Sequence, residues 1–313
     1  MELKDIKKVL ILGAGTMGQQ IGFVCAMHGY NVTLYDISDD ILKASVQRIE
    51  KLGSSFFVPT GKITTHQLKE IMGRIIATSD PKAAAKEADI ISESVPENPE
   101  LKAKIFAQFN ELCPERTIFT TNTSLLMPSK FAAATGRPEK FAALHFHDVR
   151  INNLVDVMPH PGTDPAVIQL VHDFAVSIGQ IAIMLHRENN GYVFNAMISS
   201  LLTTAMTLVA TGVASIEDVD RAWMGVTRMP IGPFGIMDQM GLKTVWTIND
   251  YWAHNTQSIP DNQIQVNADF LKQYVDRGEL GAKTKKGFYS YPMPKYAQAG
   301  FLSGATEKGI VLL

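Results

Sequence analysis

The first part of the chain alternates between short apolar runs and longer segments with helical spacing. An apolar run at residues 9–12 leads into a glycine-rich turn and a helix, and a second run covers residues 31–35. Further runs at 74–78, 89–93, 117–121 and 141–146 alternate with helical segments at 40–52, 81–87 and 99–110. Strands that alternate with helices predict a doubly wound, mostly parallel β-sheet, which is the Rossmann type of α/β fold.

The pattern changes near residue 186. Between residues 190 and 241 the apolar positions follow helical spacing, and the alternation typical of strands is absent. We therefore predict a Rossmann domain over residues 1–187 and a smaller all-helical C-terminal domain over residues 188–313. Within the first domain, the chain from residue 53 is predicted to be a loop up to a helix that starts near Thr65.

The turn after the first apolar run has the spacing G-x-G-x-x-G at Gly13, Gly15 and Gly18. Gly13 permits a tight turn, Gly15 lets the backbone approach a pyrophosphate, and Gly18 lets the helix pack closely on the strand. The pyrophosphate would lie at the helix N-terminus, where free N–H groups and the helix dipole favour an anion. Asp36 ends the second run, where a carboxylate binds ribose hydroxyls and repels a 2′-phosphate. The turn therefore predicts NAD rather than NADP as the cofactor.

Composition argues against several other classes of function. The formal net charge is −2 and no long basic run occurs, so nucleic acid and anionic membranes are not the expected partners. Cys25 and Cys113 are far apart and lack a metal-binding or C-x-x-C spacing, which favours a reduced, cytoplasmic protein. The first residues do not form a signal peptide. The uncharged stretch 192–214 contains Asn, Ser and Thr, so we expect a buried helix rather than a membrane span.

An enzyme that uses NAD to oxidise an alcohol also needs a side chain that moves a proton. His145 is the candidate, because it lies at the end of a predicted strand and histidine changes charge near neutral pH. Asp156, eleven residues later, would hold the other imidazole nitrogen and offset the charge of the protonated ring. A purely structural histidine is the alternative interpretation of the same residue.

A metal site is a second alternative for this region. His145 and His147 would face the same side of a strand, with Asp148, Asp156 or His160 as further ligands. The run lacks an established ligand spacing, and NAD-dependent dehydrogenation needs no metal, so we expect none.

Several motifs follow one another along the chain. They are Gly13-Ala-Gly-Thr-Met-Gly18, Glu93-Ser-Val-Pro-Glu97-Asn98 with Lys102, Asn122-Thr-Ser124, Leu144-His145-Phe146, Gly191-Tyr-Val-Phe-Asn195, Pro230-Ile-Gly-Pro-Phe-Gly235 with Asp238, and Lys283-Thr-Lys-Lys-Gly-Phe-Tyr-Ser-Tyr291. In this order the motifs resemble those of the L-3-hydroxyacyl-CoA dehydrogenase family, over roughly residues 5 to 291.

The resemblance implies a role for the matched residues. It makes His145 the catalytic acid/base, Asp156 its acidic partner, and Ser124 and Asn195 hydrogen-bond donors to the reacting oxygen. The residues expected to bind the cofactor are Gly13, Gly15, Thr16, Met17, Gly18, Asp36, Glu97, Lys102, Asn122, Asp148 and Lys283. It also implies a homodimer that forms through the helical domain. For residues 120–124, a capped turn is a structural alternative compatible with these roles.

The sequence departs from the family pattern at three places. Asp156 replaces a glutamate that lies one residue further from the histidine. The family's H-F-F-N-P is His145-Phe-His-Asp148-Val, and the usual arginine after Asn195 is Ala196. The first two departures fall in the region between the histidine and its acid.

The resemblance implies an NAD-dependent oxidoreductase that interconverts an L-3-hydroxyacyl-CoA and a 3-oxoacyl-CoA. Its small-molecule substrate would be an acyl-CoA thioester. One alternative keeps the fold and acts on a free 3-hydroxy acid, such as a sugar acid or a carnitine-like compound. The other is an NAD(H)-binding protein with little catalytic activity, which the altered region around His145 and Asp156 motivates.

Overall fold

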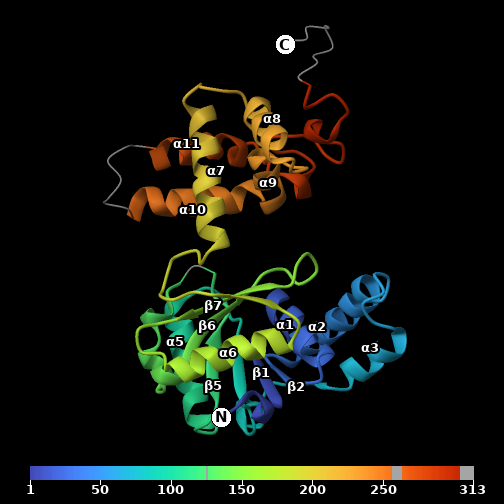
Figure 1. The fold of residues 1–313 in the computed structure, drawn as a ribbon, viewed down its shortest axis with the longest axis vertical. Helices are drawn as coiled ribbons and strands as arrows, with labels where there is room; N and C mark the ends of the chain where they lie inside the picture. Colours follow the sequence, from blue (N-terminus) through green and yellow to red (C-terminus); the bar gives the residue numbers. More distant parts are fainter. Residues whose placement is uncertain (125, 256–262, 304–313) are drawn as a thin grey trace. The chain divides into compact units, whose positions relative to one another are not determined.

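The structure, a computed structural model, describes residues 1–124, 126–255 and 263–303. The described chain forms two compact units, the first ending at Phe194 and the second beginning at Asn195. Figure 1 shows the mixed α/β first unit and the helical second unit. Each unit is described by itself below.

The described part of the first unit contains an eight-stranded sheet in the order β3-β2-β1-β4-β5-β6-β7-β8. The strands are β1 (Lys8–Leu12), β2 (Asn31–Tyr35), β3 (Ile75–Thr78), β4 (Ile90–Glu93), β5 (Ile118–Thr121), β6 (Phe141–Phe146), β7 (Leu154–Pro159) and β8 (Ile181–Met184). Strands β1 to β6 pair in parallel, whereas β7 is antiparallel to β6 and parallel to β8. The predicted Rossmann-type fold with a mostly parallel sheet is confirmed.

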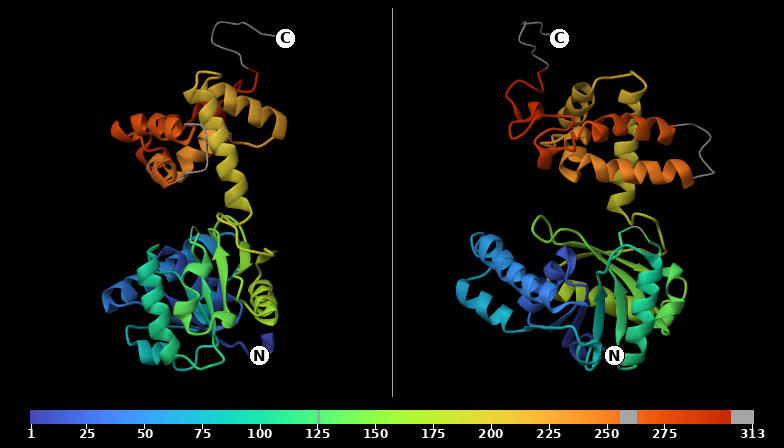
Figure 2. Two further views of the ribbon diagram at one scale, coloured as in Figure 1. Left: turned by 90° about the vertical axis from the view of Figure 1, so that its left-hand side faces the viewer. Right: turned by 180° about the vertical axis from the view of Figure 1, so that it is seen from behind.

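Helices cover both faces of this sheet. They are α1 (Thr16–Met27), α2 (Asp39–Leu52), α3 (Thr65–Met72), α4 (Pro81–Ala85), α5 (Pro99–Leu112) and α6 (Pro165–Ser177). Successive side chains of a strand point to opposite faces, so Val9 and Ile11 join one apolar core and Leu10 and Leu12 join another. The first core includes residues of α1 and α6, and the second includes residues of α4 and α5. Figure 2 shows α5 and α6 on opposite sides of the sheet.

The second unit is helical. Its helices are α7 (Phe194–Ala210), whose first residue belongs to the first unit, α8 (Ile216–Thr227), α9 (Pro233–Met240), α10 (Leu242–Asn255) and α11 (Gln263–Asp276). Its apolar core contains Leu202, Met206, Phe234, Met237 and Leu271. No helix in the described part of the chain is both long and apolar enough to cross a membrane.

Some predicted elements need correction. The chain was expected to be a loop from residue 53, but Gly53–Phe57 forms a π-helical turn directly after α2. Phe57 is buried there and packs against Phe23 of α1, which accounts for the continued helical backbone. The sequence pattern also did not predict β7, α6 and β8, although Pro159, Pro165 and Gly179 mark their boundaries.

Candidate active site

The turn between β1 and α1 has the close contacts that its glycines permit. Gly13 has a φ of 100°, and a Cβ there would lie 2.6 Å from the carbonyl oxygen of Ser94. A Cβ on Gly18 would lie 1.9 Å from the carbonyl oxygen of Gly13, so glycine is required for α1 to start this close to β1. A Cβ on Gly15, in contrast, would meet nothing within 4 Å. The space at the N-terminus of α1 is therefore open, as pyrophosphate binding requires.

Asp36 ties the end of β2 to this turn. Its Oδ2 accepts a hydrogen bond from the backbone N–H of Ala14 at 2.9 Å, and its Oδ1 accepts one from Ile37 at 2.8 Å. A carboxylate oxygen has more than one acceptor site, so both oxygens can still bind ribose hydroxyls. Thr16 and Met17 are the first residues of α1, beside the open space. These residues fit the adenosine and pyrophosphate parts of NAD.

A buried network of charged and polar groups lies behind the ends of β4 and β5. The Nζ of Lys102 lies 2.6 Å from Glu93 Oε1 and 3.1 Å from Glu97 Oε2. Burial raises the pKa of Glu93, and the charge and hydrogen bond of Lys102 oppose that rise. The hydroxyl of Thr121 donates to Glu93, and that of Thr123 donates to Glu97. Lys102 was expected to contact the cofactor directly. It is only 1% exposed and pairs with Glu97 instead.

His145 is the penultimate residue of β6 and lies directly opposite Asp156 on the antiparallel strand β7. Its Nδ1 lies 3.0 Å from Asp156 Oδ2, a hydrogen-bond distance. Burial would raise the pKa of Asp156, but hydrogen bonds from His145 and His147 outweigh it and hold the pKa below its usual value. Asp156 is therefore an ionised acceptor near neutral pH. It fixes the proton of His145 on Nδ1 and leaves Nε2 for proton exchange.

Two aromatic rings flank the histidines. The ring of Tyr192 stacks on that of His145, with centroids 4.6 Å apart and an interplanar angle of 8°. The hydroxyl of Tyr192 donates to the carbonyl oxygen of Thr123 at 2.5 Å. Burial, followed by nearby carboxylates, raises the pKa of Tyr192, so this hydroxyl stays protonated. Phe194 meets the ring of His147 edge to face, with centroids 5.9 Å apart.

His147 is the partner of Asp156 that the sequence interpretation missed. Its Nε2 lies 3.1 Å from Asp156 Oδ2, the oxygen that also accepts the hydrogen bond from His145. The sequence placed the two histidines on one side of a strand but connected His147 only with a metal. The available signal was the two-residue spacing from His145, which puts both rings within reach of any acid on the next strand.

These three side chains also have the loose spacing of a metal site. One nitrogen of each of His145 and His147 and an oxygen of Asp156 lie within 4.8 Å of one another. The two hydrogen bonds to Oδ2 account for this convergence without an ion. Of the other two ligands considered, His160 instead bonds the carbonyl oxygen of Pro138 through Nε2 at 2.7 Å, and Asp148 pairs with Arg150.

Three further residues that were expected at the site, Asn122, Asp148 and Ser124, lie in the first unit. Asn122 follows β5, and its Oδ1 accepts from the backbone N–H of Phe146 at 2.7 Å, which ties the ends of β5 and β6 together. Hydrogen bonds from Arg150 lower the pKa of Asp148 below its usual value, so its charge is already paired. Ser124 also follows β5, at the carboxyl edge of the sheet.

Asn195 and Lys283 belong to the second unit. Asn195 is its first residue, and Lys283 is exposed in the short 3₁₀ turn Ala282–Thr284. The structure therefore brings the glycine turn, the Glu97 network and the two histidines together on one sheet, whereas these two residues come from the helical unit.

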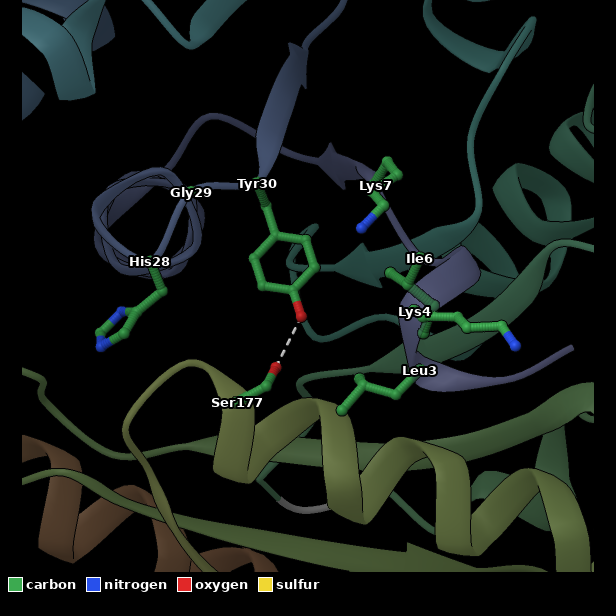
Figure 3. A pocket seen from close by; sticks show the side chains of 8 residues that line it. All are labelled: Leu3, Lys4, Ile6, Lys7, His28, Gly29, Tyr30 and Ser177. Carbon is green, nitrogen blue, oxygen red and sulfur yellow. Dashed lines mark hydrogen bonds between the residues drawn. The ribbon is translucent and has the colours of Figure 1, made fainter.

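A hollow of about 600 Å³ lies at the opposite, amino edge of the sheet. Figure 3 shows its lining, in which Tyr30 and Ser177 form a hydrogen bond of 2.6 Å. Its other lining residues are Leu3, Lys4, Ile6, Lys7, His28 and Gly29. Ligands of open α/β sheets bind at the carboxyl ends of the strands, and the candidate site lies there, away from this hollow.

Comparison with protein families agrees with this geometry. The model of the 3-hydroxyacyl-CoA dehydrogenase NAD-binding domain matches residues 8–189, and the model of the C-terminal domain of the same family matches residues 191–291. The chain belongs to the 3-hydroxyacyl-CoA dehydrogenase family. As a member, the protein is an NAD-dependent oxidoreductase, and its first unit contains the NAD-binding domain.

Members and solved structures cover nearly the whole chain. The mitochondrial hydroxyacyl-coenzyme A dehydrogenase of Rattus norvegicus is 31% identical over 291 residues, which is 91% of each chain. A solved diketoreductase is 40% identical with a TM-score of 0.84, covering 91% of this chain and 99% of that one. The (S)-3-hydroxybutyryl-CoA dehydrogenase of Ralstonia eutropha is 28% identical with a TM-score of 0.82, at the same coverage.

Proposed function

We propose that the protein interconverts an L-3-hydroxyacyl-CoA and a 3-oxoacyl-CoA, with His145 as the acid/base. The observation that carries this proposal is the His145–Asp156 hydrogen bond at the carboxyl edge of an NAD-binding sheet. Relatives that are named for 3-hydroxyacyl-CoA or 3-hydroxybutyryl-CoA support the acyl-CoA substrate.

In this proposal each polar group has one task. Bound NAD supplies the hydride chemistry at the substrate carbon. Nε2 of His145 takes the proton of the 3-hydroxyl during oxidation and returns it during reduction, while Asp156 offsets the charge of the ring. Ser124 and Asn195 donate hydrogen bonds to the reacting oxygen, where negative charge develops during reduction.

The remaining contacts concern the cofactor. The glycine turn and Asp36 hold the pyrophosphate and the adenosine ribose. On the nicotinamide side the proposed contacts are Glu97, which Lys102 holds in place, and Asn122, Asp148 and Lys283. The proposal gives no role to a metal ion, because dehydrogenation with NAD does not need one.

A second candidate substrate is a dicarbonyl compound or hydroxy acid without CoA. The diketoreductase, at 40% identity, is described as acting on dicarbonyl compounds, and it is more similar to this chain than the two CoA dehydrogenases compared above. The replacement of the family glutamate by Asp156 is a further reason to test it.

One substrate comparison separates the two candidates. Purified protein would be assayed for NADH oxidation with acetoacetyl-CoA, with free acetoacetate and with a 3,5-dioxo ester that lacks CoA. A kcat/KM at least tenfold higher for the thioester supports the CoA substrate. A preference for the ester or the free acid rejects it in favour of the second candidate. NADH binding without turnover of any of the three would favour a catalytically weak binding protein.

Two further proposals concern assembly and location. A homodimer through the helical unit is supported by exposed apolar side chains on and after α7, among them Met197 at 61% and Val213 at 70% exposure. Size-exclusion chromatography with light scattering tests this, and a monomeric mass would contradict it. A cytoplasmic location is supported by Cys25 and Cys113, which are buried free thiols.

A further inference from the structure

One carboxylate oxygen accepts hydrogen bonds from both histidines of the candidate site. Oδ2 of Asp156 lies 3.0 Å from His145 Nδ1 and 3.1 Å from His147 Nε2. The other oxygen, Oδ1, is buried and has no hydrogen-bond partner among the described residues. Asp156 itself is 1% exposed, so no bulk water relieves its charge. The two imidazoles therefore share the charge of a single buried carboxylate at one atom.

We propose that His147 is a positioning residue that shares Asp156 with His145 and thereby sets the pH range over which His145 exchanges a proton. This inference rests on the proposed function of His145 as the acid/base.

The hydrogen bonds determine where the protons lie. An ionised carboxylate only accepts hydrogen bonds, so His145 carries a proton on Nδ1 and His147 carries one on Nε2. The lowered pKa of Asp156 keeps this acceptor ionised over the neutral range. Two donors on one oxygen divide its negative charge, so Asp156 offsets less of the positive charge that His145 gains with a second proton.

Charge repulsion acts in the same direction. The two imidazole centroids are 4.8 Å apart, and both side chains are mostly buried, with exposures of 7% and 15%. One carboxylate can offset one imidazolium, and a second positive charge at this distance is unfavourable. Protonation of His147 therefore opposes protonation of His145.

Among the described residues, Asp156 is the one acid that forms an ion pair with His147. The neighbours of His147 are His145 on β6, Asp156 on β7 and the uncharged ring of Phe194. Asp148, the next residue along the chain, is paired with Arg150. Tyr192, on the far side of His145, is neutral because burial and then the nearby carboxylates raise its pKa. These carboxylates are Asp156, Glu97, Glu93 and Glu188.

Two substitutions separate charge sharing from packing. His147→Phe keeps a ring against Phe194 and removes the donor, whereas His147→Gln keeps an N–H donor of similar reach. The initial rate of NADH oxidation is followed as a function of pH for both variants and the wild type. We expect the alkaline limb of the rate profile to move to higher pH in His147→Phe than in the wild type, because Asp156 then accepts from His145 alone. His147→Gln should stay near the wild-type limb.

A measurement that does not depend on turnover keeps this test separate from the proposed function. ¹⁵N NMR of the histidine side chains follows the titration of His145 whether or not the substrate is turned over. An upward shift of that titration in His147→Phe, and a smaller one in His147→Gln, supports the inference even if acyl-CoA is not the substrate. An identical titration in the wild type and His147→Phe, or equal rate losses in both variants without any shift, would overturn it.

Discussion

The imidazole of His145 and the carboxylate of Asp156 lie directly opposite each other on the antiparallel strands β6 and β7, joined by a hydrogen bond of 3.0 Å. Their separation of eleven residues in sequence is thus one step across a strand ladder. Because the register sets this distance, the shorter side chain of aspartate still reaches the ring. The geometry of the pair depends on the sheet more than on the intervening loop.

Asp156→Asn should lower kcat about a hundredfold or more. An amide neither fixes the proton of His145 on Nδ1 nor offsets the charge of the protonated ring. Steady-state NADH oxidation measures the loss, and NADH affinity from fluorescence titration should stay close to the wild-type value. Asp173→Asn, a partly exposed acid on α6, is the matched control. A wild-type kcat in Asp156→Asn would remove Asp156 from the mechanism.

The stability contribution of Asp156 should depend on pH in one direction. Its pKa is below the ordinary carboxyl value in the folded state, so the contribution is fully present above the unfolded-state pKa and is lost as the pH falls through the folded-state pKa. The difference in melting temperature between the wild type and Asp156→Asn should therefore narrow as the pH is lowered from 6 to about 3. A difference that grows in acid would show that the hydrogen bonds do not stabilise the ionised carboxylate.

The glycines of the NAD turn should differ in what they tolerate. Gly18→Ala would place a Cβ 1.9 Å from a backbone oxygen and should lower the melting temperature markedly. Gly15→Ala meets no protein atom, so the fold should remain while NADH affinity falls about tenfold or more, because the Cβ occupies the approach to the pyrophosphate. Thermal melts and NADH titrations of both variants check this contrast. Equal effects of the two substitutions on stability would contradict it.

A buried acid organises the second unit. Asp238 accepts hydrogen bonds from the backbone N–H groups of Phe288 and Tyr289, each at 2.9 Å, and from the hydroxyl of Tyr291 at 3.0 Å. Asp238→Ala leaves these donors without their acceptor and should destabilise the protein by about 3 kcal/mol. Asp276→Ala, which removes an exposed ion pair with Lys272, should have little effect and is the control. Chemical denaturation measures both, and matching values would refute this role.

Much of the fold was predictable because its signals are local. The glycine turn, Asp36 and the strands up to β6 each carry a short pattern of their own, and the structure has them. The π-helical turn at Gly53–Phe57 was not predictable in this way, because it depends on the packing of Phe57 against Phe23.

The candidate site was predictable to a smaller extent. The sequence suggested that Asp156 would reach His145, but the shared oxygen and the contact with His147 follow from strand register, which no single-strand pattern specifies. The burial of Lys102 likewise follows from its pairing with Glu93, a residue that the sequence interpretation had not assigned to the site.

The central claim is that His145 moves the proton during turnover with an acyl-CoA. The most direct measurement is the kcat/KM of NADH oxidation with acetoacetyl-CoA for the wild type, His145→Gln and the surface control His172→Gln. We predict that His145→Gln loses about a hundredfold or more of kcat/KM while it keeps the wild-type NADH affinity, and that His172→Gln loses nothing. Wild-type turnover by His145→Gln would contradict the account.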